Sequence, residues 1–355
     1  MKHRNGVVTL GGCVEQRGKE LPSSTPTKKW GQPKRVLILG DGALAQDLAR
    51  VLIRDRPHRF DVKGFLSPNP NLVGTSLVNP TVIGTIDQLF ELTEQHKIQS
   101  IAVCMEDRRG TLPLESLLDV KSMGIEVVDG HRLYEDECGR LSVDELKPSF
   151  LIFSSGFQRK PMTMFLKRLG DFLGALLGLI VLAPLYGLIA LAIRFDSPGP
   201  VFYRQTRVGH HGYPFVLLKF RSMRADAEAD GVQWATADDQ RITKLGRWLR
   251  TLRLDELPQL YNVVKGEMSL VGPRPERPHF VRDLQKDIPY YDLRHTVRPG
   301  ITGWAQICFR YAGSLEDSLM KLQYDLYYVK NLSLWLDVRI LFRTVRVVLC
   351  GEGAR

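Results

Sequence analysis

Cysteine is sparse in this sequence, and its pattern excludes two common kinds of stabilising site. The five cysteines are widely scattered, odd in number and without a Cys-x-x-Cys pair, so neither a zinc site nor a disulfide framework is predicted. A reducing, cytosolic environment is the simplest interpretation. Residues 1–30 also lack an apolar run of seven or more residues, which excludes a secretory signal. We expect residues 1–33 to form a disordered basic tail.

The first part of the chain has no net charge. Residues 1–158 carry 20 Lys and Arg against 20 Asp and Glu, whereas residues 159–355 carry 29 against 19 and so hold the whole formal charge of +10. This division predicts two domains with different partners, which a length of 355 residues allows. A basic half attracts nucleic acid, anionic lipid or phosphorylated substrates. Because no nucleic-acid reader motif is recognisable, we predict that nucleic acid is not a partner.

Short apolar runs alternate with helical patterns through the neutral half. Compact apolar runs predict buried strands, and apolar residues at three- and four-residue spacing predict helices. The expected strands are 35–40, 60–66, 100–104 and 125–129, and the expected helices are 47–53, 84–96 and 114–123. This alternation predicts a Rossmann-like parallel α/β domain over residues 34–150.

A glycine turn follows the first expected strand. Gly40 and Gly42 stand in a Gly-x-Gly-x-x-Ala sequence, in which Ala45 replaces the third glycine of a dinucleotide-binding turn. The helix N-terminus after such a turn favours phosphate. However, no acid clearly ends the second expected strand, where a ribose partner would stand, and no catalytic set for hydride transfer accompanies the turn. A structural or regulatory role and nucleotide binding both remain open.

One apolar run is long enough for a membrane. Residues 172–193 carry no charge, and a helix that spans the hydrocarbon core needs about 20 apolar residues. Pro184, after Ala183, kinks or breaks a helix past the middle of the run. Basic residues flank both ends, which favours keeping both ends cytoplasmic. A re-entrant helix over about residues 168–195, broken at Ala183-Pro184, meets both conditions. A spanning helix and a buried core helix are the alternatives.

Two adjacent acids, Asp255 and Glu256, lie in one of the most basic stretches of the chain. Four Lys and Arg residues precede them within eleven positions. Such cations keep a carboxylate ionised, and could hold an anionic substrate while the carboxylate attacks it or binds a metal. Pro258 suits the first turn of a helix, which would place the pair at a helix N-terminus. From the residues alone, a pair of first-turn acids that only complements the helix dipole is the alternative.

Five motifs in the basic half resemble the bacterial sugar transferase family, the monotopic phosphoglycosyl transferases. They are DSPGPVFYRQTRVG (196–209), FVLLKFRSM (215–223), the Asp255-Glu256 segment (244–258), VGPRPE (271–276) and VRPGITGW (297–304). The resemblance implies a mainly helical monotopic membrane catalytic domain over residues 167–355, after a linker at 151–166. It also implies transfer of a sugar phosphate from a UDP-sugar to a polyprenyl phosphate (undecaprenyl phosphate), with release of UMP. The implied location is the cytoplasmic face of a bacterial inner membrane.

The resemblance also implies roles for individual residues. In the family, the aspartate of the acid pair attacks the phosphate that bears the sugar, which gives Asp255 as the nucleophile and Glu256 as its catalytic partner. Mg²⁺ is the implied cofactor, in contact with Asp255 or Glu256. The residues expected to bind the substrate or its phosphates are Lys219, Arg221, Arg250, Pro273, Arg274, Glu276 and Asp325, together with Arg204, Gln205 and Arg207. For the last three, lipid headgroups are an alternative partner, and for Lys219 and Arg221 the alternative is a solvated strand edge.

The neutral half resembles the CoA-binding-like domain of long family members that serve exopolysaccharide pathways. The motifs concerned lie at residues 84–87, 107–113 and 151–154. Those members usually begin with a bundle of four transmembrane helices, which this sequence does not show. Relatives also often carry Ser-Pro at the helix break, where this chain has Ala183-Pro184. A non-enzymatic, nucleotide-sensing protein docked to the membrane is the alternative function, and a homodimer remains open.

Overall fold

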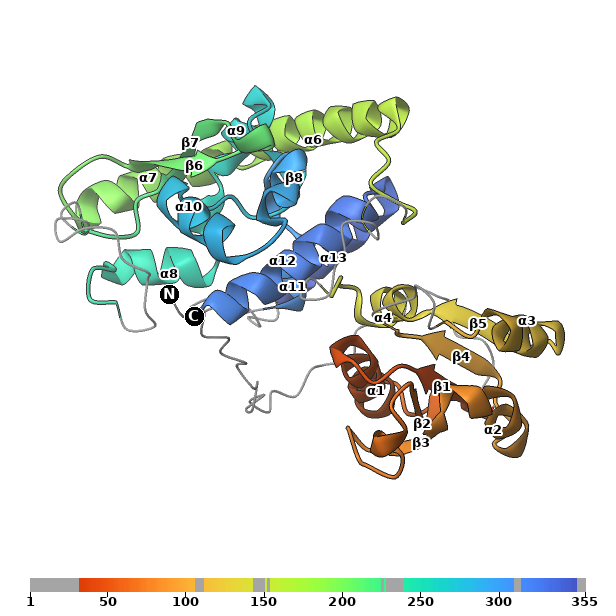
Figure 1. Ribbon diagram of the computed structural model, residues 1–355. Coiled ribbons are helices and arrows are strands. Elements are labelled where there is room, and N and C mark those ends of the chain that lie inside the picture. The colour runs from red at the N-terminus through yellow and green to blue at the C-terminus, as the bar shows by residue number, and fades with distance from the viewer. Residues whose placement is uncertain are drawn as a thin grey trace, which may run out of the picture.

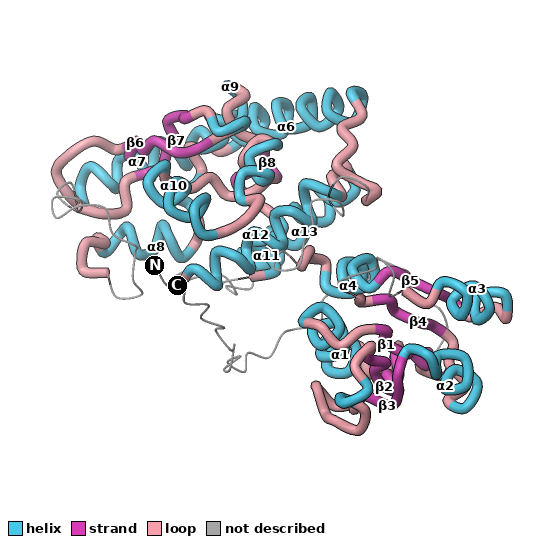
Figure 2. The backbone as a smooth tube through the Cα atoms, viewed as in Figure 1, coloured by secondary structure: helices cyan, strands magenta, loops and turns pink. Residues whose placement is uncertain are grey.

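The protein is a mixed α/β structure in which an α/β unit is followed by a helix-rich unit (Figure 1). The computed structural model describes residues 32–105, 112–142, 151, 154–224, 227, 239–309 and 314–349. The predicted tail therefore lies almost wholly outside the described residues, as do much of the motif at 107–113 and part of the predicted linker. Figure 2 shows that strands gather in the first unit, while helices make up most of the second.

A five-stranded parallel sheet forms the centre of the first unit. Its order is β3-β2-β1-β4-β5, and each neighbouring pair is parallel. The strands are β1 (Lys34–Leu39), β2 (Phe60–Ser67), β3 (Val82–Thr85), β4 (Ser100–Val103) and β5 (Glu126–Asp129). The predicted parallel sheet is confirmed, and four of its strands match the expected ranges within one residue at each end. The edge strand β3 was not predicted.

Helices cover both faces of this sheet. They are α1 (Ala43–Asp55), α2 (Leu89–Gln95), α3 (Leu114–Ser122) and α4 (Gly130–Cys138), with single 3-10 turns η1 (Pro70–Leu72) and η2 (Ile86–Gln88). Alternation along β1 sends Val36 and Ile38 into one core, shared with α1 and α4. It sends Leu37 and Leu39 into a second core, shared with α2 and α3. Both faces of the central strand are therefore apolar.

The second unit is mainly helical and carries two small sheets. Its first part contains α6 (Pro161–Val181), α7 (Ala183–Asp196), β6 (Phe202–Val208), η3 (His210–Gly212), β7 (Pro214–Phe220), α8 (Lys244–Thr251), η4 (Leu254–Glu256) and α9 (Gln259–Lys265). Its second part contains β8 (Ser269–Val271), α10 (Pro278–Asp287), η5 (Tyr291–Thr296), β9 (Gly300–Thr302), α11 (Trp304–Cys308), α12 (Leu315–Lys330) and α13 (Leu334–Leu349). Strands β6 and β7 pair antiparallel, and β8 and β9 pair parallel.

The long apolar run forms a bent pair of helices. Helices α6 and α7 meet at Leu182 with a bend of 61°, one residue before the predicted break at Ala183-Pro184. Pro184 stands in the first turn of α7, where a backbone donor would have no helical partner in any case. Among the described residues, the length and apolarity needed to cross a membrane are met by no single helix, and only by this bent pair taken together.

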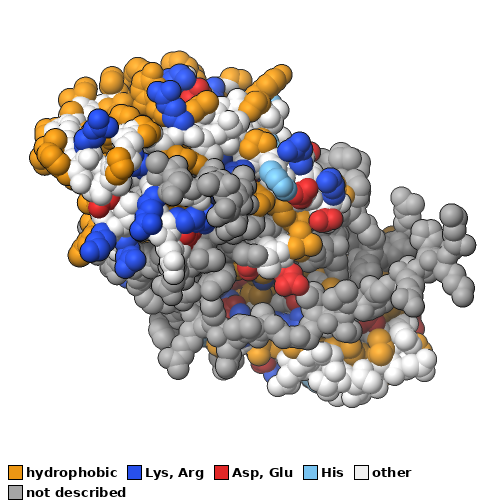
Figure 3. Space-filling view, turned by 90° about the vertical axis from the view of Figure 1, so that its left-hand side faces the viewer, with side chains coloured by type: hydrophobic (Ala, Val, Ile, Leu, Met, Phe, Trp, Pro, Cys, Tyr) orange, Lys and Arg blue, Asp and Glu red, His pale blue; other side chains and the backbone are white. Residues whose placement is uncertain are grey.

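The outer surface of the bent pair is strongly apolar. Ile180 and Leu188 are 64% and 66% exposed, and Phe195 near the end of α7 is 83% exposed. Figure 3 shows hydrophobic side chains gathered along this upper edge of the molecule, with Lys and Arg side chains beside and below them. An exposed apolar surface of this kind, bordered by cations, suits a lipid interface.

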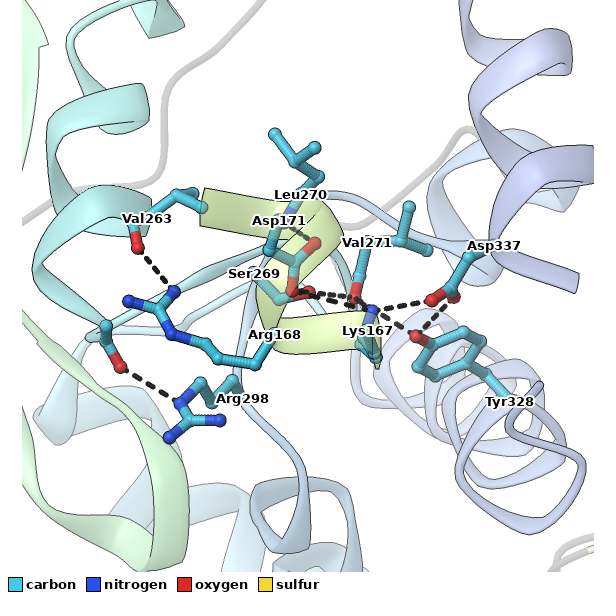
Figure 4. A network of polar contacts seen from close by, with 11 residues as sticks. Lys167, Arg168, Asp171, Val263, Ser269, Leu270, Val271, Arg298, Tyr328 and Asp337 are labelled. Atoms are coloured by element: carbon cyan, nitrogen blue, oxygen red, sulfur yellow. Dashed lines mark hydrogen bonds and ion pairs between the residues drawn. The ribbon is translucent and has the colours of Figure 1, made fainter. Parts of the chain in front are cut away.

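A buried polar network fastens α6 to the rest of the second unit (Figure 4). The ammonium of Lys167 lies 2.7 Å from Asp337 on α13, and it donates a hydrogen bond to the backbone oxygen of Val271 at 3.1 Å. One turn further, the carboxylate of Asp171 accepts from the Ser269 hydroxyl at 2.7 Å. Between them, Arg168 donates to the carbonyl of Val263 at 2.7 Å, near the end of α9. The apolar helix is thus held to α9, the helix that directly follows η4.

The two units contact each other through α4, α11 and α12. Glu135 on α4 forms a buried ion pair with Lys330 at the end of α12. The indole nitrogen of Trp304 on α11 donates to the carbonyl of Gly139 at 2.7 Å, and the amide of Leu141 donates to the carbonyl of Gln323 at 3.1 Å. The first unit therefore rests on the same two helices that form a wall of the site described below.

Candidate active site

The acid pair lies in a single 3-10 turn between two helices. After α8 ends, Arg253 adopts a left-handed conformation (φ 57°), which is uncommon for a residue with a side chain. Asp255 and Glu256 follow in η4, and α9 begins after Pro258. The pair thus occupies its own turn just before a helix, rather than the first turn of that helix. Both carboxylates are buried.

Glu256 is neutralised by three cations. Its Oε1 atom lies 2.7 Å from Arg274, 3.5 Å from Lys219 and 3.7 Å from Arg253. Burial alone would raise the pKa of Glu256, but the charges of Arg274 and Lys219 outweigh burial and hold this pKa well below its usual range. Glu256 is therefore ionised, and it holds the three cations in place around the turn.

Asp255 has a different environment from its neighbour. Within the described part of the chain, its carboxylate has no hydrogen bond or ion pair, although it is only 7% exposed. Burial raises the pKa of Asp255, and the charges of Lys219, Arg274 and Arg250 oppose this rise. A buried carboxylate without a fixed partner, close to cations, is suited to attack an electrophile.

The β6-β7 hairpin brings several predicted residues to one face. Lys219 stands opposite Tyr203 in the ladder, and Gln205 and Arg207 follow on the same face at two-residue spacing. Arg207 lies 3.6 Å from Glu276, and burial lowers the pKa of Arg207 to about 10. The intervening Arg204 lies on the opposite, exposed face. The structure thus brings Lys219, Gln205 and Arg207 together and separates Arg204 from them.

Arg221 and Arg250 have different surroundings. The guanidinium of Arg221 is buried and donates to the carbonyls of Pro198 (3.1 Å) and Ser197 (2.6 Å), just after α7. These bonds fix the backbone that directly follows α7. A substrate role for Arg221 stays a prediction. Arg250 on α8 is near enough for its charge to oppose the rise in the pKa of Asp255.

The loop after β8 is held by a second set of buried ions. The carbonyl of Pro273 accepts from the amide of Gly300 at 2.9 Å, and the carbonyl of Arg274 accepts from Arg294 at 2.9 Å. Arg294 forms an ion pair of 2.7 Å with Asp325 on α12, and both side chains are almost fully buried. Asp325, predicted near the metal or substrate, is thus the partner of the residue that positions Arg274.

A cavity of about 200 Å³ opens beside the acid pair. Its lining comprises Arg253, Arg274, Glu276, Arg294, Ala305, Gln306, Ile307, Phe309, Lys321, Asp325 and Val347. Lys321, Arg294 and Gln306 were not predicted from the sequence. Lys321 precedes the predicted Asp325 by four residues on one helix, a spacing that places both on the same face and could have revealed it.

Asp255 and Glu256 are two adjacent buried carboxylates that could hold a divalent cation. Across the described ranges, no three His, Cys, Asp or Glu side chains lie close enough to form a metal cage. Mg²⁺ commonly uses only one or two carboxylates together with substrate phosphates. Asp255 and Glu256 fit that pattern, because the three cations all approach Oε1 of Glu256 and leave its Oε2 atom and the Asp255 carboxylate without an ion pair among the described residues.

The residues of this site lie within a part of the chain that matches a known protein family. The model of the family described as "Bacterial sugar transferase" matches residues 162–351, a span that contains the acid pair, the hairpin and the cavity. The chain belongs to the bacterial sugar transferase family. The resemblance predicted from the sequence motifs is thereby confirmed.

Individual relatives show the extent of the similarity between this bacterial sugar transferase and curated proteins. The chain is 45% identical over 224 residues to the UDP-N-acetylgalactosamine-undecaprenyl-phosphate N-acetylgalactosaminephosphotransferase of Aeromonas hydrophila, covering 63% of this chain and 52% of the relative. It is 34% identical over 341 residues to the undecaprenyl-phosphate glucose phosphotransferase of Komagataeibacter xylinus, covering 93% and 62%. It is 33% identical over 332 residues to the UDP-glucose:undecaprenyl-phosphate glucose-1-phosphate transferase of Escherichia coli K12, covering 89% and 68%. The chain therefore spans about half to two thirds of the length of these relatives.

Proposed function

We propose that the protein transfers a sugar 1-phosphate from a UDP-sugar to undecaprenyl phosphate or a similar polyprenyl phosphate. The named relatives act on substrates of these two classes. The observation that carries the proposal is the contrast within the acid pair. Glu256 is bound to three cations, whereas Asp255 has no such partner among the described residues. This arrangement provides a nucleophile and a binding place for phosphate oxygens within one turn.

The proposed chemistry has two displacements. First, an Oδ atom of Asp255 attacks the phosphorus that bears the sugar, and the bond from this phosphorus to the bridging oxygen breaks. UMP leaves with that oxygen and its electron pair, and the sugar phosphate is bound to Asp255. Second, a phosphate oxygen of the polyprenyl phosphate attacks the same phosphorus, which frees the carboxylate of Asp255 and gives a polyprenyl diphosphate sugar. A carboxylate nucleophile thus divides one difficult transfer into two easier ones.

The cations around the turn stabilise charge during both displacements. Arg274 and Lys219 already bind Oε1 of Glu256, so they are fixed before a substrate arrives. Phosphoryl transfer depends mainly on such positioning and on neutralisation of the phosphate oxygens. Mg²⁺ would be held by Asp255 and Glu256 together with the substrate phosphates, and would supply further positive charge there.

A donor screen tests the proposed reaction. The protein in detergent or nanodiscs is incubated with polyprenyl phosphate, Mg²⁺ and one UDP-sugar at a time, and released UMP is measured. We expect at least one UDP-sugar to give UMP that depends on both the lipid and Mg²⁺. If UDP-sugars bind but no combination releases UMP, the protein is a nucleotide-sensing protein and not a transferase.

The pH dependence of transfer should report the ionisation of Asp255. Burial raises the pKa of this carboxyl, and only the ionised form attacks, so activity should fall as the pH drops through the raised pKa. Lys219 is the strongest of the charges that oppose the rise. Lys219→Met should therefore move the acid limb of kcat/KM to higher pH, in addition to lowering the rate. Lys286→Met, an exposed change on α10, should leave the limb in place.

We further propose that the bent pair α6 and α7 enters one leaflet and returns, with the catalytic unit at the cytoplasmic face of the inner membrane. The proposal is supported by the 61° bend, the exposed apolar surface and the basic flanks. From this position the active site would meet a lipid phosphate at the headgroup level and a nucleotide sugar from the cytosol. The product, a polyprenyl diphosphate sugar, would be the first intermediate in the synthesis of a surface glycan.

Labelling of introduced cysteines tests this topology. Lys160→Cys and Asp196→Cys place a thiol at each end of the bent pair, and Gln285→Cys on exposed α10 marks the catalytic unit. We expect all three to react with a membrane-impermeant maleimide only in inside-out vesicles, against the background of the unsubstituted chain. Reaction of one flank from the periplasmic side would show that the pair spans the membrane.

A further inference from the structure

Glu276 and Lys321 lie side by side in the lining of the cavity and form a long ion pair. The Lys321 ammonium lies 3.8 Å from Oε1 of Glu276, which is too long for a hydrogen bond. Among the residues that the structure describes, neither side chain makes a hydrogen bond. The cations Lys321, Arg294 and Arg207 outweigh the effect of burial and lower the pKa of Glu276, so this carboxylate is ionised. Glu276 also forms an ion pair of 3.6 Å with Arg207, but the carboxylate and the Lys321 ammonium both keep their capacity for hydrogen bonds to a ligand.

The cavity around this pair has room for one part of a nucleotide sugar. Its volume is about 200 Å³, below the roughly 300–1,000 Å³ typical of pockets that enclose a whole drug-sized ligand. Ile307 and Phe309 give the lining apolar surface beside its charged groups. A pyranose ring matches this mixture, because it offers C–H faces to apolar side chains and hydroxyl groups at its edge.

The location of the cavity favours the transferred sugar over the nucleoside. Arg274 lines the cavity and also binds Glu256, so the cavity begins one side chain away from the acid pair. In the donor, the sugar is joined directly to the phosphorus that Asp255 would attack, whereas the ribose lies beyond the second phosphate. The four cations of the lining would attract a phosphate group, but a phosphate offers only acceptors and could not donate to the ionised Glu276, as a hydroxyl can.

We infer that Glu276 and Lys321 recognise the transferred sugar by holding two adjacent hydroxyl groups. One hydroxyl donates to the Glu276 carboxylate, and its neighbour accepts from the Lys321 ammonium. The pair is a specificity determinant because the epimer of a hydroxyl that it holds would leave a partly buried charged group without its hydrogen bond. This inference rests on the proposed function and assigns a sugar subsite within the same active site.

The test compares donors that differ in one hydroxyl with a nucleotide that has no sugar. Steady-state kcat/KM is measured for UDP-glucose, UDP-galactose and their N-acetyl derivatives, and UMP is measured as an inhibitor. In Glu276→Gln and Lys321→Met, kcat/KM for the preferred donor should fall roughly ten-fold or more, and the preference between epimers should shrink. Inhibition by UMP should stay within about two-fold of the original protein, because UMP lacks the transferred sugar.

Matched variants separate recognition from folding. Lys286→Met makes the same change on the exposed surface of α10 and should alter neither donor preference nor UMP inhibition. Lys321→Gln keeps an N–H donor at the site, and should retain part of the preference if Lys321→Met does not fold. Equal weakening of UMP inhibition and donor use would assign the pair to the nucleotide and overturn the inference, as would unchanged epimer preference. Absence of UMP release in the original protein would count against the proposed function alone, and donor and UMP binding measured by calorimetry would then decide the subsite.

Discussion

Asp255→Asn should lower sugar-phosphate transfer by roughly 10⁴-fold or more, the scale of loss seen when a catalytic nucleophile is removed. Asparagine keeps the shape of the side chain, so the cations bound to Glu256 should remain in place. What is lost is the negative oxygen that forms the bond to phosphorus. UMP release with the preferred UDP-sugar, polyprenyl phosphate and Mg²⁺ provides the measurement.

A labelled donor shows whether the loss concerns the covalent step. With UDP-sugar labelled in the sugar and no lipid acceptor, the original protein should retain label after denaturation, and Asp255→Asn should retain none. Asp283→Asn, an exposed change on α10, is the matched control and should behave like the original protein. Transfer that persists unchanged in Asp255→Asn would show that another group attacks, or that the lipid attacks the donor directly.

Asp325→Asn should destabilise the protein by about 3–5 kcal/mol, because it leaves the buried charge of Arg294 without its counter-ion. The reason is the low exposure of both partners, which prevents water from replacing the lost carboxylate. Activity should fall as well, since Arg294 holds the backbone of Arg274. Denaturation of the purified protein, followed by the loss of helical signal, measures the stability change.

A double variant separates this structural role from ligand binding. Replacing both partners, as Asp325→Leu with Arg294→Met, removes the charges together and should restore most of the lost stability. If Asp325 instead contacts the metal or substrate, the Asp325→Asn variant would keep normal stability. It would then need a higher concentration of Mg²⁺ or donor to reach the same activity. The two results would lead to different assignments for this residue.

The elements that sequence patterns predicted well are those whose signal is local. The strands of the parallel sheet stand out as apolar runs, and four of them lie where expected. Strand β3 was missed because Val82–Thr85 runs directly into a 3-10 turn, so its glycine and threonine resemble the start of a helix. The break in the apolar run was predicted to within one residue, because proline interrupts the helix in which it stands, whatever the helix packs against.

The site shows where local patterns are insufficient. The charge pattern around Asp255 and Glu256 is visible in sequence, but the separation of their environments depends on Lys219 and Arg274, which come from elements far apart in the chain. The roles of Arg221 and Asp325 also depend on packing. One binds carbonyls after α7, and the other binds an arginine on η5. No spacing rule gives these partners.

Helix α12 has a consequence for how the two units work together. It runs from Leu315 to Lys330, about 24 Å, with Lys321 and Asp325 on the cavity and Lys330 bound to Glu135 of the α/β unit. The α/β unit thus contacts the same helix that forms one wall of the cavity, and we expect a displacement of this unit to change the width of the proposed sugar subsite at Lys321.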